Sequence, residues 1–143
     1  TTLSINRDYF EAGFTAKGVQ RGDPYDRGVI YLLDSARKEI FLLEPENYRD
    51  WIRLYAYEYD SSGKASTVII CEAGYPEDDG QHTVSFRREG SEFTVFVDGK
   101  VRCSGIYTGQ TASKKPEYVR LFGRGSNSGS GLDVVQVLIR EYR

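Results

Sequence analysis

The residues best suited to chemistry lie in one stretch, Trp51–Tyr59, which reads WIRLYAYEY. Its side chains alternate at period two, as in a strand whose successive residues point to opposite faces. One face carries Ile52, Leu54 and Ala56, and we expect it to lie in a core. The other face carries four aromatic residues and an arginine: Trp51, Arg53, Tyr55, Tyr57 and Tyr59. We expect Arg53, Tyr55 and Tyr57 to be at least partly exposed.

This aromatic face has the chemistry of a sugar platform. Sugar rings present C–H surfaces bordered by hydroxyls, which match the flat rings and polar tips of Tyr and Trp. Arginine adds a planar donor fork for hydroxyls or a uronate carboxylate. Same-face neighbours on a strand are about 6.6 Å apart, a little more than one sugar unit. We predict carbohydrate contacts from Trp51, Arg53, Tyr55 and Tyr57. The alternative is that Trp51 and one or two tyrosines are core residues, because a lone tryptophan is usually well buried.

The acidic residues do not form a catalytic pattern. Glycoside hydrolysis needs two carboxylates across a cleft, and no predicted strand carries alternating acids such as E-x-D-x-x-E. Glu58 is alone on its strand, while Glu44 and Glu46 fall in a segment expected to be a loop. The single histidine, His82, offers no Ser–His–Asp set. The glycine-rich segment 123–131 lacks the GK[ST] ending of a phosphate loop. We expect a protein that is not an enzyme.

Composition narrows the class of protein further. The chain has 143 residues, the size of one domain over 1–143, with 19 basic and 21 acidic residues. This near-balance argues against nucleic acid as a partner, and no apolar stretch is long enough to span a membrane. Fifteen glycines and eleven tyrosines favour strands and turns. Methionine is absent even at position 1, so we expect a mature or excised segment.

The two cysteines, Cys71 and Cys103, lie near strand-like runs. They form either one disulfide of a secreted domain or two buried thiols, and sequence does not separate these alternatives. Neither belongs to a CxxC pair, so a zinc site is not expected.

Short strands separated by turn signals run along the whole chain. The clearest hairpin signal is Asp98-Gly99, between expected strands at 93–97 and 100–103. Further strands are expected at 9–18, 29–33, 40–43, 67–71, 82–88, 118–122 and 132–140, with 44–50 interrupting structure and 108–117 forming a polar loop. No segment holds a helical period over three turns. The pattern indicates an all-β sandwich or barrel.

Two segments carry a family likeness. Residues 82–101 read HTVSFRREGSEFTVFVDGKV, and 132–137 read LDVVQV. The first resembles the H-x-V-x-x-x-R strand that turns through glycine into L-Y-V-D-G in concanavalin A-like, laminin G-type jelly rolls. The second resembles their I-D-x-V-x-I strand. The resemblance covers roughly 80–140 and implies a jelly-roll β-sandwich of two antiparallel sheets, one of them concave. It also implies sugar binding on the concave face or at loop tips, or cell-surface adhesion.

Alternation adds two residues to the expected site. If Val137 and Ile139 face inward, Gln136 faces outward, and Arg120 alternates in the same way with Val119. We therefore place Arg120 and Gln136 on the same concave face. Relatives often hold a calcium ion, and the loop acids available for one are Asp23, Asp26, Asp78 and Asp79. They form no spaced calcium motif, so we expect no cofactor, with a structural calcium as the alternative.

These observations predict a secreted, monomeric, non-catalytic carbohydrate-binding module. Its ligand would be a plant cell-wall polysaccharide, a β-glucan or hemicellulose chain, bound by aromatic stacking on the concave sheet. It would target the attached catalytic or scaffold modules of a larger polysaccharide-degrading protein to this ligand. We expect no nucleic acid or membrane partner. The alternatives are a laminin G-like adhesion domain that binds protein through its loops, or a lectin-like domain. The lectin-like domain would bind short glycans at its loop tips, where segment 123–131 would matter most.

Overall fold

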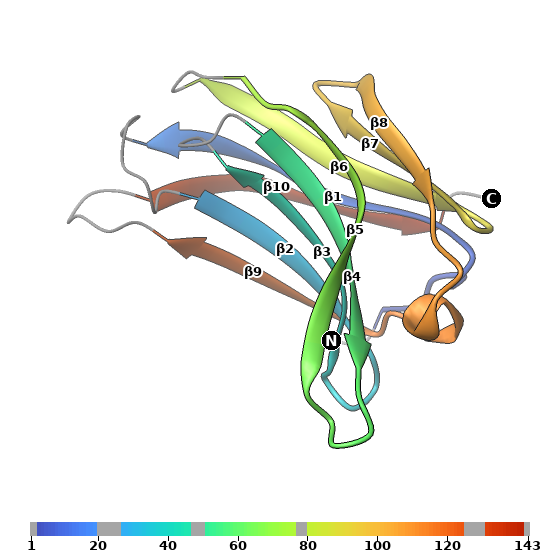
Figure 1. Cartoon of the computed structure of the whole chain (residues 1–143). Helices are drawn as coiled ribbons and strands as arrows, with labels where there is room; N and C mark the ends of the chain where they lie inside the picture. Colours follow the sequence, from blue (N-terminus) through green and yellow to red (C-terminus); the bar gives the residue numbers. More distant parts are fainter. Residues whose placement is uncertain (1–2, 20–26, 47–50, 77–79, 125–130, 142–143) are drawn as a thin grey trace.

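The chain folds into two antiparallel five-stranded sheets packed face to face (Figure 1). The computed structural model describes residues 3–19, 27–46, 51–76, 80–124 and 131–141, with side chains over 3–15, 29–45, 51–76, 80–121 and 136–141. The strands are β1 (Tyr9–Val19), β2 (Arg27–Leu33), β3 (Glu39–Glu46), β4 (Trp51–Tyr59), β5 (Ala65–Gly74), β6 (Gln81–Glu89), β7 (Glu92–Val97), β8 (Lys100–Ile106), β9 (Tyr118–Arg124) and β10 (Gly131–Glu141). The first sheet has the order β10-β1-β6-β7-β8 and the second β5-β4-β3-β2-β9. The predicted all-β sandwich is confirmed.

Phenylalanine rings from both sheets fill the space between them. Phe10, Phe41, Phe86 and Phe93 are all fully buried. The Phe41 ring of the second sheet lies 5.1 Å from Phe93 and 6.0 Å from Phe86 of the first, measured between ring centroids. Such tilted and edge-on contacts suit the charge distribution of aromatic rings. This core fixes the inner face of each strand, so the alternate residues of the second sheet must point outward.

Two hairpin turns of similar sequence close the same end of the second sheet, DSARK after β2 and DSSGK after β4 (Figure 1). In each, the Oδ1 atom of the aspartate, Asp34 or Asp60, accepts hydrogen bonds at 2.9 or 3.0 Å from the backbone N–H groups two and four residues later. Arg37 and Gly63 occupy the same left-handed position, with φ of 63° and 86°. The aspartate turn chemistry is therefore encoded locally twice.

A disulfide joins the edge strands of the two sheets. Cys71 of β5 and Cys103 of β8 are bonded, with their Cα atoms 5.9 Å apart. The structure thus has the disulfide and not the pair of free thiols. Near it, Gly105 lies so close to the backbone carbonyl of Ile70 that a Cβ atom would overlap it. The two edges are therefore in direct contact along this side of the sandwich.

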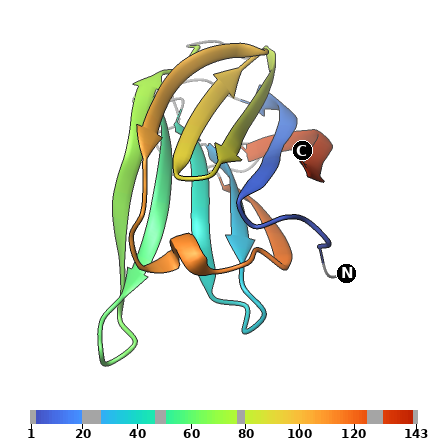
Figure 2. The same ribbon diagram turned by 90° about the vertical axis from the view of Figure 1, so that its right-hand side faces the viewer.

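The structure differs from expectation at two segments. Strand β3 continues through Glu44 to Glu46, whereas the sequence predicted an interruption at 44–50, and Pro45 pairs with Ile52 of β4. Proline has no N–H to donate, and the ladder with β2 is interrupted beside it, between the Ile30–Leu43 and Arg27–Glu46 pairs. The loop expected at 108–117 contains a short 3₁₀ helix, η1 (Gln110–Ser113). Figure 2 shows this segment crossing the lower end of the sandwich between β8 and β9.

Candidate functional site

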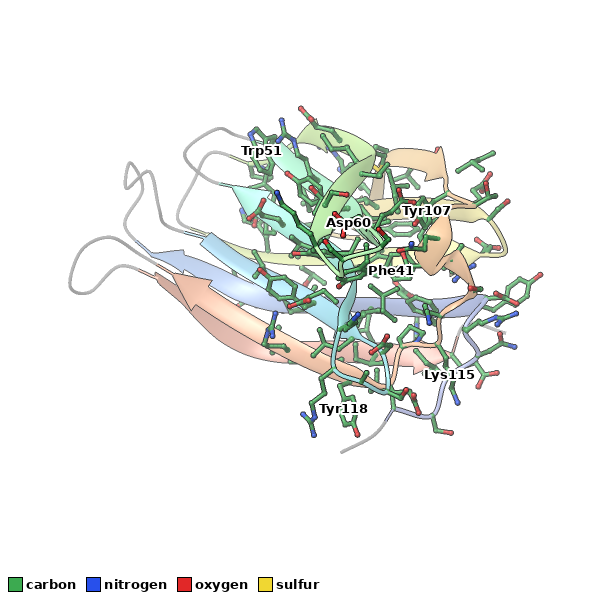
Figure 3. The ribbon with its side chains drawn as sticks, turned by 60° about the horizontal axis from the view of Figure 1, so that its bottom comes forward. Phe41, Trp51, Asp60, Tyr107, Lys115 and Tyr118 are labelled. Carbon is green, nitrogen blue, oxygen red and sulfur yellow. A yellow bond between two sulfur atoms is a disulfide. The ribbon has the colours of Figure 1, made fainter. Side chains whose placement is uncertain are left out.

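The aromatic row of β4 lies on the outer face of the second sheet. Ile52, Leu54 and Ala56 are fully buried, and the alternate residues of the strand are partly exposed: Trp51, Arg53, Tyr55, Tyr57 and Tyr59. The predicted division between a buried and an outer face is therefore what the structure shows. The row extends along the whole strand, from Trp51 at one end to the turn at Asp60 at the other (Figure 3).

Arg53 is held between its neighbours on β4 and β5. Its Nε donates a hydrogen bond to the carboxylate of Glu72 at 2.7 Å, and its Nη1 donates to the hydroxyl of Tyr55 at 3.2 Å. Its guanidinium also lies over the Trp51 ring, 4.0 Å from the ring centroid. These contacts place Trp51 on the outer surface and not in the core. The hydrogen bonds that Arg53 donates to Tyr55 and Glu72 raise its pKa above the ordinary value, so the side chain is a permanent cation.

The strand register places two carboxylates beside Arg53. Glu44 of β3 pairs with Arg53 on one side, and Glu72 of β5 pairs with it on the other. Directly paired residues of antiparallel strands share a face. The three side chains therefore form a row across the sheet in the order Glu44, Arg53, Glu72. Sequence analysis did not identify either glutamate as part of the site, because strand register is not visible in the sequence.

The tyrosines cover the middle of the sheet and do not stand away from it. Leu42 pairs with Tyr31 of β2 and with Tyr55 of β4, and it is only 6% exposed although it lies on the outer face. The rings of Tyr31 and Tyr57 meet with centroids 6.4 Å apart. Burial, and then the neighbouring Tyr31 hydroxyl, raise the pKa of Tyr57. The Tyr57 hydroxyl therefore stays protonated at neutral pH and can both donate and accept hydrogen bonds.

A second polar cluster lies at the far end of the row and includes Arg120. Although Arg120 comes from β9, its Nη2 donates to the Glu39 carboxylate of β3 at 2.9 Å, and its guanidinium lies 4.5 Å from the centroid of the Tyr31 ring. The hydroxyl of Tyr59 donates to the backbone carbonyl of Glu39 at 2.7 Å. Burial works to raise the pKa of Glu39, but the hydrogen bonds from Arg120, the backbone and Tyr59, with the charge of Arg120, together outweigh it and keep that pKa below its ordinary value. Arg120 therefore belongs to the same face as the β4 row.

A cavity of about 310 Å³ adjoins this cluster. Residues of the two hairpin turns line it together with η1, including Lys38, Tyr59, Asp60 and Gln110. The Gln110 side-chain amide accepts from the Tyr59 N–H at 2.7 Å and donates to the Tyr59 carbonyl at 2.8 Å. The Gln110 amide thus makes the backbone hydrogen bonds that a neighbouring strand would make, at a point beyond the end of β3. The row of β4 ends at this cavity.

Gln136 does not join these residues. It lies on β10 in the first sheet, where it pairs with Thr15 of β1 and is exposed. Alternation correctly indicated an outward side chain, but it carries no information about which of two sheets a strand enters. The segment 125–130 lies outside the described residues, as do Asp23, Asp26, Asp78 and Asp79. Within the part of the chain that the structure describes, no group of three or more His, Cys, Asp or Glu side chains could hold a metal ion.

The carboxylate of Glu58 is engaged in hydrogen bonds at the end of the sandwich. Its Oε2 accepts hydrogen bonds from the Tyr107 hydroxyl at 3.0 Å and from the Gln110 N–H at 3.2 Å. These contacts tie η1 to the end of β4. Glu58 therefore acts in the packing of the sandwich end and does not project over the aromatic row.

Comparisons with known proteins place this geometry in a fold class. No family model matches the sequence, and no curated protein matches it either. Among solved structures, the carbohydrate-binding module CBM66 from Bacillus subtilis matches with a TM-score of 0.60 and 15% identity, over 94% of this chain and 73% of that one. Sheep galectin-11, solved in complex with glycerol, matches with a TM-score of 0.65 and 12% identity, over 98% and 95% of the two chains.

A third match is the CBM2 module of an evolved Dit from phage J-1 of Lactobacillus casei BL23. Its TM-score is 0.65 at 14% identity, over 96% of this chain and 66% of that one. At these identities the likeness is one of fold. The chain is a jelly-roll β-sandwich of the kind found in carbohydrate-binding modules and galectins, which confirms the concanavalin A-like fold expected from residues 80–140.

Proposed function

We propose that residues 1–143 form one monomeric, non-catalytic carbohydrate-binding domain, which binds an extended glycan along the outer face of β4. The observation that carries this proposal is the unbroken row Trp51, Arg53, Tyr55, Tyr57 and Tyr59, partly exposed while the alternate residues are buried. The row is about 27 Å long, at 3.3–3.4 Å per residue, which is enough for several sugar units. The solved structures with the same fold, carbohydrate-binding modules and a galectin among them, support a sugar ligand.

The row offers two kinds of contact to a sugar chain. Ring faces pack against the C–H surfaces of the sugar, and hydroxyl, guanidinium and carboxylate groups beside the rings bind its hydroxyls. Trp51 and Tyr55 flank Arg53, so a sugar that stacks on one of these rings comes within reach of the guanidinium and of Glu72. Tyr57 and Tyr59 continue the row toward the Glu39–Arg120 pair and the cavity. The ligand would therefore run parallel to β4.

The ligand class and setting that we propose are those predicted from the sequence. The ligand is a plant cell-wall β-glucan or hemicellulose chain, and the domain targets the catalytic or scaffold modules of a larger secreted, polysaccharide-degrading protein to it. The Cys71–Cys103 disulfide supports an extracellular setting, because disulfides persist where the environment is oxidising. No helix in the described ranges is long and apolar enough to cross a membrane.

Two variants test the site. Trp51→Ala and Tyr55→Ala each remove one ring from the row and should weaken glycan binding by about 1–3 kcal/mol. Binding is measured by affinity electrophoresis and calorimetry on β-glucan and xylan. Val101→Ala is the matched control, because Val101 is 63% exposed on β8 of the other sheet.

The result that contradicts the proposal is unchanged glycan affinity in both aromatic variants, provided circular dichroism shows that they are folded. If the affinity depends instead on loop residues, the lectin-like alternative holds. If the domain retains no polysaccharide but binds protein, the adhesion alternative holds. Trp51 is the single tryptophan of the chain, so a fluorescence change on adding oligosaccharide would report on this face directly.

A further inference from the structure

Two arginines on this face, Arg53 and Arg120, are each paired with a carboxylate. We propose that Glu72, supported by Glu44, is a specificity determinant that makes the face select neutral glycans and exclude uronate-containing or sulfated ones. The inference rests on the proposed function, because it names the class of glycan that the same face takes. It also assigns a role to two residues that belong to neighbouring strands and not to the aromatic row.

A row of charged side chains crosses β3, β4 and β5. Arg53 pairs with Glu44 on one side and Glu72 on the other, so two carboxylates flank one guanidinium. The Arg53–Glu72 contact is a short ion pair, 2.7 Å from Nε to Oε2. Glu44 is 8% exposed, which limits the water that can screen it. Because the Arg53 guanidinium is already paired with Glu72, an anionic ligand would meet an arginine whose charge is neutralised.

The second cluster repeats this arrangement. Arg120 is paired with Glu39 at 2.9 Å, so its guanidinium is also neutralised before any ligand arrives. The two arginines lie at separate points of the row, over Trp51 and over Tyr31 respectively. An extended acidic glycan would therefore find neither cation available as an isolated positive charge.

A neutral sugar fits the same groups without breaking them. A guanidinium has five N–H donors, and two of those on Arg53 are engaged by Glu72 and Tyr55. A hydroxyl can accept from a further guanidinium donor and donate to a carboxylate oxygen, because it is both donor and acceptor. A uronate carboxylate only accepts. It could use the same free donors of Arg53, but it would bring a further negative charge beside Glu72, with no hydroxyl proton to donate to that carboxylate.

The test compares a neutral with an anionic polymer on one protein and two variants. Wild type, Glu72→Gln and Glu92→Gln are titrated with a neutral β-glucan and with a polyuronate, following Trp51 fluorescence and affinity electrophoresis at low salt. Glutamine keeps an oxygen that can accept from Arg53 Nε, so Glu72→Gln removes charge with little change of shape. Glu92→Gln is the control, because Glu92 is exposed on β7 of the other sheet.

We expect wild type to bind the neutral polymer in preference. Glu72→Gln should raise the affinity for the polyuronate by about two- to tenfold, the effect of one partly exposed charge pair, and added salt should remove the gain. Glu92→Gln should leave the ratio of the two affinities unchanged. If Glu72→Gln fails to fold, Glu39→Gln makes the same test at Arg120.

Two results overturn the inference. One is a wild-type preference for the polyuronate, and the other is an unchanged affinity ratio in a folded Glu72→Gln or Glu39→Gln variant. Both leave the proposed function standing, because the domain still binds a glycan. Failure of the wild type to bind any neutral or acidic polysaccharide overturns the proposed function together with the inference.

Discussion

Removing the disulfide between Cys71 and Cys103 tests how the two sheets are held together. The cysteines are 32 residues apart in sequence. The loop-closure relation for a cross-link of this length gives about 3.7 kcal/mol at 25 °C, through restriction of the unfolded chain. The double variant Cys71→Ala/Cys103→Ala should therefore lose about 3–4 kcal/mol of unfolding free energy, a large share of the stability of a domain of this size. Alanine is chosen because Cys71 is 8% exposed and serine would bury a hydroxyl.

The assay is equilibrium urea unfolding followed by circular dichroism, with wild type in the presence of a reductant as the second arm. Because the cross-link restricts the unfolded state, the slope of the transition should rise when it is removed, and both midpoint and slope must be fitted. The reduced wild type and the double variant should agree. A loss below about 1 kcal/mol in both would refute the reasoning, because it would mean that the Cys71–Cys103 link does not constrain the unfolded chain.

Glycan binding should survive removal of the disulfide. Trp51, Arg53 and Tyr55 lie on β4, which pairs with β3 along the side away from the disulfide. We therefore expect the folded double variant to keep the glycan affinity of wild type within about twofold, since the row remains between two paired strands. Thermal unfolding in the presence of ligand separates the loss of stability from any loss of binding.

Two further changes test the ends of the sheets. Tyr59→Phe removes the hydrogen bond to the Glu39 carbonyl and should lower the unfolding free energy by about 1 kcal/mol at pH 7. Burial and the Glu39 carboxylate raise the pKa of Tyr59 to about 12, above its unfolded value of about 10. The stabilisation by the Tyr59 hydroxyl is therefore complete below pH 10 and is lost as the pH rises toward 12. The unfolding free energies of wild type and Tyr59→Phe should converge over this range in urea titrations. A constant difference between them would contradict the assignment. Gly105→Ala places a methyl group against the Ile70 carbonyl and should lower the unfolding free energy by about 1–3 kcal/mol in the same assay. The control is Ser104→Ala, at an exposed neighbouring position. Gly99→Ala is not suitable as a control, because the positive φ of Gly99 would add strain. Unchanged stability in Gly105→Ala would show that the edges of β5 and β8 are not in close contact.

The strand pattern was predictable because the period of the sequence reflects a local property of the chain. The alternation in Trp51–Tyr59 and the turn residues on either side defined β4 with the bounds that the structure has. The same alternation separated Ile52, Leu54 and Ala56 from the aromatic row, since side chains of a strand must point to alternate faces. Segment 44–50 was predicted less well. A proline normally interrupts a strand, and only the neighbouring strands show how β3 accommodates Pro45.

The candidate site was predictable in part for the same reason. Residues on one strand, such as Trp51 and Arg53, share a face by alternation alone. Glu44 and Glu72 come from strands on either side, and their position beside Arg53 depends on the register of β3 and β5. Nothing local in a sequence encodes that register, because it is set by the packing of both sheets and by the lengths of the connecting turns.

The sequence alone determined that this chain is an all-β sandwich or barrel with one strand that offers an aromatic and an apolar face. Composition, alternation and turn residues are sufficient for that conclusion, since each acts within a few residues of itself. Only the tertiary structure decided which distant residues meet on the face. It brought Arg120 of β9 to Glu39 at one end of the row, and it placed Gln136 on the opposite sheet. The physical reason is that strand order and sheet membership depend on contacts between residues far apart in the chain, and these form only when the core between the two sheets closes.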